Sequence, residues 1–147
     1  MSGYLLDTNC VSELVRIQPE PRVMEWMDAA GEEQLYLSVL TLGEIRKGLA
    51  GQVQSKRRRQ VETWLDVDLQ TRFAGRILSI NGPVAEHWGL LAARAKTKGI
   101  PLPIMDGLLA ATALHYNLTM VTRNVADFAS TLVPVLNPWN DSTSRSH

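Results

Sequence analysis

Short apolar runs alternate with longer segments of helical periodicity along the chain. The runs that predict strands cover residues 4–6, 35–39, 77–80, 119–122 and 132–136. Pro134 lies in the last run, and because proline cannot donate to a central ladder, it favours an edge strand there. The segments between the runs predict amphipathic helices, most clearly where Val84, Trp88, Leu91 and Ala95 recur at helical spacing.

This alternation predicts the fold class. Strands that are separated by helices form parallel sheets with right-handed crossovers, so we expect an α/β/α sandwich with a central parallel sheet of four or five strands. In such folds the functional crevice lies beyond the carboxyl ends of the strands. Candidate chemistry should therefore be sought among the residues that follow each apolar run.

The composition is that of an ordinary globular chain. The 147 residues carry 15 Lys and Arg against 15 Asp and Glu, and we expect one domain over residues 1–139 and a polar, disordered tail over residues 140–147. Zero formal charge argues against a large polyanion-binding surface but leaves room for a local basic patch. Cys10 is the only cysteine, which excludes a disulfide scaffold and suits a reducing cytoplasm. No segment reads as a signal peptide or a membrane span, so we expect a cytoplasmic protein.

Four acidic residues lie at positions that this fold would bring together near the carboxyl ends of the strands. Asp7 ends the first run, Asp127 follows the fourth, and Glu44 and Asp106 lie near the starts of two predicted helices. Two carboxylates about 4 Å apart repel by about 4 kcal/mol at an effective dielectric of about 20, and a divalent cation relieves that repulsion. Oxygen ligands with few histidines favour Mg²⁺ or Mn²⁺ over Zn²⁺. The four acids therefore indicate metal-assisted hydrolysis of a phosphate ester.

Most of these positions also have a structural interpretation. Thr41 and Glu44 have the spacing of a capping box. Asp106 would complement a helix dipole, and Asn124 would serve as an N-cap. Asp7 is the exception, because an acid that ends a buried first strand has no common structural role.

Two sets of side chains leave alternatives open. Several cations form either a solvated helix surface or a contact with phosphate groups: Arg46, Lys47, Lys56, Arg57, Arg58 and Arg59. Several bulky apolar residues exceed what one small sheet needs and indicate a homodimer: Met24, Trp26, Met27, Val61, Trp64 and Leu65.

Four motifs, in this order, together resemble a known family. They cover residues 5–9, 40–48, 102–113 and 121–128, and the closing Asn137-Pro138-Trp139 fits as well. Over residues 4–139 the chain resembles the PIN-domain ribonucleases, and more narrowly the VapC and FitB-like toxins of bacterial toxin–antitoxin modules. The resemblance implies a PIN-like fold, a Mg²⁺- or Mn²⁺-dependent endoribonuclease acting on RNA, and a cognate antitoxin that binds a toxin homodimer to form a heterotetramer or larger assembly.

The resemblance also implies roles for individual residues. Asp7 and Asp106 match the principal metal ligands of the family, and Glu44 matches its third acid. Asp127 is the supporting acid, in direct or water-mediated contact with the metal, whereas some members have an aspartate where this chain has Asn124. Further polar support comes from Asn9, Thr122 and Asn124. The basic residues named above then contact the RNA backbone.

Other classes fit less well. A haloacid-dehalogenase-like phosphatase requires a second aspartate two residues after Asp7, where this chain has Asn9. A receiver domain requires adjacent acids before the end of the first strand and a late lysine, neither of which is visible. The serious alternative is a non-catalytic PIN-type RNA-binding or regulatory module, which would be expected to have lost acids that this chain retains.

Overall fold

All five apolar runs contribute strands to one parallel sheet. In the computed structural model, which describes residues 3–140, the strands are β1 (Tyr4–Leu6), β2 (Leu35–Ser38), β3 (Ile77–Leu78), β4 (Thr119–Val121) and β5 (Val135–Leu136). Their order is β3-β2-β1-β4-β5, and every neighbouring pair is parallel. β5 lies at the edge, as predicted, but it begins directly after Pro134 and does not include residues 132–134. The carbonyl of Pro134 accepts the N–H of Met120 at 2.8 Å.

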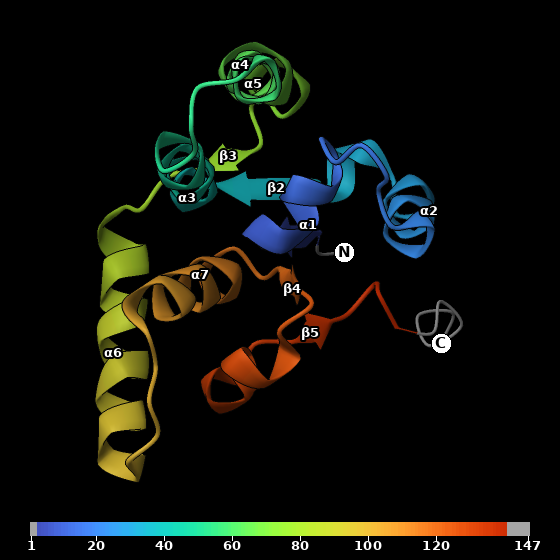
Figure 1. Ribbon diagram of the computed structural model, residues 1–147. Helices are drawn as coiled ribbons and strands as arrows, with labels where there is room; N and C mark the ends of the chain where they lie inside the picture. Colours follow the sequence, from blue (N-terminus) through green and yellow to red (C-terminus); the bar gives the residue numbers. More distant parts are fainter. Residues whose placement is uncertain (1–2, 141–147) are drawn as a thin grey trace.

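Helical segments cover both faces of this sheet (Figure 1). The α-helices are α1 (Thr8–Glu13), α2 (Pro21–Ala30), α3 (Val39–Ala50), α4 (Lys56–Thr63), α5 (Leu69–Arg72), α6 (Gly82–Lys98) and α7 (Ile104–His115). Shorter segments are the 3₁₀ helices η1 (Glu32–Gln34) and η3 (Val125–Thr131) and the π-helical turn η2 (Trp64–Asp68), which joins α4 to α5. The predicted α/β/α sandwich is confirmed.

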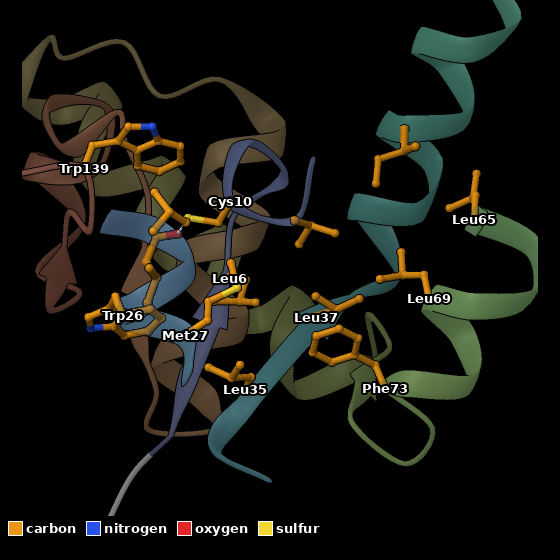
Figure 2. Close-up of a cluster of buried hydrophobic side chains, with 14 of the residues drawn as sticks. Leu6, Cys10, Trp26, Met27, Leu35, Leu37, Leu65, Leu69, Phe73 and Trp139 are labelled. Atoms are coloured by element: carbon orange, nitrogen blue, oxygen red, sulfur yellow. Dashed lines mark hydrogen bonds between the residues drawn. The ribbon is translucent and has the colours of Figure 1, made fainter. Parts of the chain in front are cut away.

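The central strand β1 separates two hydrophobic cores. Successive side chains of a strand point to opposite faces, so Leu6 packs with one buried cluster and Leu5 with the other. The Leu6 cluster lies under α1, α2, α3 and the stretch from α4 to α5 (Figure 2). The Leu5 cluster lies under α6, α7 and η3, and Figure 1 shows α6 and α7 packed side by side.

Local capping fixes where the helices begin and end. The side chain of Asn81 accepts the N–H of Val84 at 3.0 Å at the start of α6, and Gly99 ends that helix with a φ of 67°. The side chain of Ser38 caps α3 by accepting the N–H of Leu40 at 3.0 Å. The capping-box interpretation of Glu44 is therefore wrong, because the helix has already begun before Thr41.

The proposed surplus of apolar surface is also contradicted. Trp26, Met27 and Leu65 are each at most 3% exposed and belong to the Leu6 core (Figure 2). Val61 and Trp64 pack partly buried against the same core. The length of α2 and of the stretch from α4 to α5 gives one face of the sheet a larger core than its short strands alone suggest. These side chains therefore carry no argument for a homodimer.

Within residues 3–140, no helix is long and apolar enough to cross a membrane. The predicted tail begins at Asn140, the last described residue, and residues 141–147 lie outside the described part of the chain.

Candidate active site

The four predicted acids come from four different elements. Asp7 directly follows β1, Glu44 lies in α3, and Asp106 and Asp127 lie in the first turns of α7 and η3. Their charges act on one another. The pKa of Asp106 is raised to about 6, first by burial and then by the negative charges of Asp127, Asp7 and Glu44. The fold thus brings the four carboxylates into one electrostatically coupled cluster, called the acidic crevice below.

Asp7 is the most constrained member of the acidic crevice. Its side chain is 8% exposed, one oxygen accepts the N–H of Thr8 at 2.7 Å, and the other accepts the hydroxyl of Thr122 at 2.8 Å. Burial raises the pKa of Asp7, these two hydrogen bonds oppose the rise, and the charges of Glu44 and Asp127 add to it. The expectation that Asp7 lacks a structural role is wrong, because it is the N-cap of α1.

Thr8 contacts two of the candidate site residues, although the sequence analysis assigns it no role. Its backbone N–H holds Asp7, while its hydroxyl donates to Glu44 at 2.5 Å and lies 3.2 Å from the hydroxyl of Thr41. One residue therefore connects two of the four acids. The signal was present in its position directly after Asp7, but nothing local in the sequence links it to a glutamate 36 residues away.

Thr122 supports the acidic crevice from the end of β4. Its hydroxyl donates to Asp7 and accepts both the N–H of Asn124 at 3.0 Å and the amide of Asn9 at 3.3 Å. The amide oxygen of Asn9 accepts the N–H of Arg123 at 3.3 Å. Asn124 is the residue before η3, yet its side chain makes no capping hydrogen bond, so the predicted N-cap is wrong in that respect.

The predicted basic contacts divide into two groups. Arg46 pairs with Asp66, Arg58 lies 3.2 Å from Glu62, and Arg57 donates to the carbonyl of Val15. Within residues 3–140, Lys47, Lys56 and Arg59 have no carboxylate within 4.0 Å. The first group is engaged in contacts within the chain, and the charges of the second are not paired with a carboxylate of the described residues.

The acidic crevice suits a hard divalent cation in the kind of ligand it offers. Asp7 and Asp106 supply carboxylate oxygens, which Mg²⁺ prefers, and Mg²⁺ keeps several waters while using few protein ligands. Within residues 3–140, no three acid, histidine or cysteine side chains are already arranged to enclose an ion. A site of this kind binds through one or two carboxylates and completes its coordination with water.

Two hollows flank the acidic crevice. A groove of about 710 Å³ runs beside Glu44, lined mainly by apolar atoms of residues that include Leu40, Gly43, Gly48 and Met105. A smaller hollow of about 440 Å³ lies beside Asp127. Glu44 and Asp127 therefore each border a hollow that can receive a ligand or a partner segment.

A five-stranded parallel sheet between helical layers, with four acids whose charges act on one another, defines an α/β domain built around an acidic crevice. The chain belongs to the PIN domain family, whose pattern it matches over residues 4–131. It is 40% identical over 137 residues to "Toxin FitB" of Neisseria gonorrhoeae, covering 93% of this chain and 99% of that one. It is 36% identical over 135 residues to "VapC ribonuclease Y4jK" of Sinorhizobium fredii, covering 92% and 96%.

Solved structures agree with these relatives. The crystal structure of FitAcB from Neisseria gonorrhoeae superposes with a TM-score of 0.87 at 39% identity, covering 94% of this chain and 99% of that one. The structure of FitAB bound to an IR36 DNA fragment gives the same TM-score of 0.87 at 38% identity, covering 94% and 96%. The resemblance to PIN-domain toxins is thereby confirmed at the level of the family.

Proposed function

We propose that this chain is a divalent-metal-dependent endoribonuclease that hydrolyses RNA phosphodiester bonds in the cytoplasm. The observation that carries the proposal is the mutual repulsion of four carboxylates, which contributes to raising the pKa of Asp106 to about 6. Carboxylates that repel one another at a functional site are stabilised by a bound cation. A relative that is named a VapC ribonuclease supports the same reaction class.

Asp7 and Asp106 would hold the ion directly, and Glu44 and Asp127 would bind it directly or through water. When bound, Mg²⁺ or Mn²⁺ lowers the pKa of an attacking water and offsets the negative charge of the phosphate. Because the pKa of Asp106 is about 6, this carboxyl group has to lose its proton for the ion to bind, so metal affinity rises with pH through that value.

Two threonines prepare the carboxylates for this role. Thr122 fixes one oxygen of Asp7 and Thr8 fixes one oxygen of Glu44, which limits the rotation of both groups. Within residues 3–140, the carboxylate of Asp106 has no hydrogen-bond partner, so its orientation depends on α7 and on whatever binds in the acidic crevice. The site thus combines two carboxylates of fixed orientation, those of Asp7 and Glu44, with the carboxylate of Asp106, whose side chain can reorient.

The experiment that tests the proposal is RNA cleavage by purified protein in EDTA, and after addition of Mg²⁺ or Mn²⁺. Cleavage should vanish in EDTA, return with either metal, and leave 5′-phosphate and 3′-hydroxyl ends. Asp7→Asn should abolish it, whereas the matched control Asp28→Asn, an exposed aspartate on α2, should not. Undiminished cleavage in EDTA would refute the metal mechanism. RNA binding without cleavage under any metal would instead identify a non-catalytic module.

We also propose that the protein is the toxin of a toxin–antitoxin pair and that it forms a homodimer. The relative named toxin FitB and the solved FitAB structure support a partner protein. An antitoxin segment lying in the 710 Å³ groove would reach the acidic crevice at Glu44 and could place an Arg or Lys among the carboxylates. The exposed Leu90 on α6 and Ile104 on α7, which are 70% and 64% exposed, supply apolar surface for self-association.

A further inference from the structure

Arg123 occupies a fixed position at the rim of the acidic crevice. It directly follows Thr122, whose hydroxyl is bonded to Asp7. Its own backbone is held on both sides, because its N–H donates to Asn9 at 3.3 Å and its carbonyl accepts the amide of Asn137 at 3.4 Å. The main chain at this position therefore links β4, α1 and the segment after β5.

The side chain of Arg123 is oriented by an aromatic ring. Its guanidinium carbon lies 5.1 Å from the centre of the Trp139 ring, within cation–π distance. Trp139 is only 7% exposed and packs into the Leu6 core, where Figure 2 shows it near Cys10. The backbone N–H of Trp139 donates to the side chain of Asn137 at 2.9 Å. The ring is thus a rigid support, while Arg123 itself remains exposed.

Among residues 3–140, no acid pairs with this arginine. Six other arginines lie within 4.0 Å of a carboxylate, but within residues 3–140 Arg123 does not, although four carboxylates lie at the adjoining crevice. The charge of Arg123 does not contribute to the pKa shifts of Asp7 and Asp106. The guanidinium donors of Arg123 are not used by side chains or carbonyls of the described residues, so they are available to a ligand.

We infer that Arg123, supported on the Trp139 ring, binds a backbone phosphate of the RNA next to the phosphate that is cleaved. The inference rests on the proposed ribonuclease function. An acidic crevice repels a polyanion, and one bound ion compensates only at the phosphate it touches. A planar guanidinium matches the oxygens of a neighbouring phosphate in a bidentate manner. Because the contact with the Trp139 ring already restricts the side chain, little further ordering is needed on binding.

The test compares Arg123→Gln with the matched control Arg94→Gln, which changes an exposed arginine on α6 in the same way. Arg123→Gln should raise KM for a single-stranded RNA by about tenfold or more, with a smaller change in kcat. It should also reduce the salt dependence of binding by about 0.7 units of log slope. Arg123→Lys should keep that slope but recover KM only in part, because it keeps the charge and loses the planar fork. Arg94→Gln should change neither quantity.

A purely structural role for the Arg123–Trp139 contact gives a different pattern. Arg123→Gln would then lower the melting temperature and leave KM and the salt slope unchanged, which would overturn the inference. RNA binding measured by fluorescence anisotropy separates this failure from failure of the proposed function. If the wild-type protein cleaves RNA and Arg123→Gln binds it equally well, only the inference fails. If the wild type does not cleave RNA but Arg123→Gln weakens binding, the phosphate contact stands and the catalytic proposal fails.

Discussion

Replacing Asp106 with asparagine tests the acidic crevice most directly. The substitution is nearly isosteric, so it removes one negative charge while keeping the shape of the side chain. In the wild-type protein this charge is opposed by burial and by three neighbouring carboxylates, which raise the pKa of Asp106 from 3.8 to about 6. The folded state therefore holds the ionised form of Asp106 less favourably than the unfolded state does.

The size of the effect follows from that shift. A rise from 3.8 to about 6 corresponds to about 3 kcal/mol at about 1.36 kcal/mol per unit. Asp106 is partly exposed, so solvent screening reduces this to about 1 kcal/mol. The N-terminal dipole of α7 favours the same carboxylate by about 0.3–1 kcal/mol. Without metal at pH 8, Asp106→Asn should therefore melt no lower than wild type and up to about 4 °C higher.

The sign of the pH dependence is set by the raised pKa. Because the unfolded state ionises at lower pH than the folded state, the wild-type protein loses stability as pH rises from about 4 through about 6. The asparagine variant lacks this loss. The difference in melting temperature between the two proteins should consequently be larger at pH 8 than at pH 4.

The assay is thermal unfolding of both proteins in EDTA at the two pH values, repeated at pH 8 with Mg²⁺. Mg²⁺ should stabilise the wild type more than the variant, because stabilisation grows with the logarithm of occupancy. Asp28→Asn, on α2, serves as the control and should respond to Mg²⁺ as the wild type does. A variant that is less stable at pH 8, gains equally from Mg²⁺ and still cleaves RNA would show that Asp106 only complements its helix dipole.

Packing and assembly give two further predictions. A Cβ at Gly107 would lie 2.9 and 3.0 Å from ring atoms of Trp88, so Gly107→Ala should cost about 1–3 kcal/mol despite a helix-propensity gain of about 1 kcal/mol. A Cβ at Gly89 would meet nothing within 4 Å, so Gly89→Ala should raise the free energy of unfolding measured by chemical denaturation. Equal effects of the two substitutions would contradict the packing argument. Light scattering should give twice the 16.3 kDa of one chain, and co-expression with the cognate antitoxin should suppress toxicity. A monomer at micromolar concentration, or unrelieved toxicity, would contradict the respective proposal.

The strands and the acids could be predicted because their signals are local. Each strand lies in an apolar run, and Pro134 marks the run that supplies the edge strand. Asp7 and Asp127 follow their strands in sequence, and the parallel topology then brings strand ends to one edge of the sheet. The rule that relates strand ends to a functional crevice therefore located the candidate site without any knowledge of side-chain contacts.

The errors concern features that depend on tertiary structure. Ser38 and Thr41 are both suitable N-caps, and the choice depends on where β2 ends, which its pairing with Leu78 of β3 decides. The ion pair of Arg46 with Asp66 spans 20 residues and has no local signal. Likewise, a short strand does not reveal how large a core the helices build over it, which is why the sequence counts Trp26 among apolar residues in excess of what the sheet needs.

The position of β1 at the centre of the sheet has a consequence for protein synthesis. β1 pairs with residues 35–36 on one side, but its other partner, β4, is made only at residues 119–121. The hydrogen bond from Thr122 to Asp7 closes a loop of 115 residues, and Asp127 is made later still. Long-range pairings of this kind form late. A growing chain consequently carries Asp7 and Glu44 before the segments that complete the acidic crevice are made. A chain that stops before β4 lacks the pairing of β1 with β4, and it also lacks Asp127.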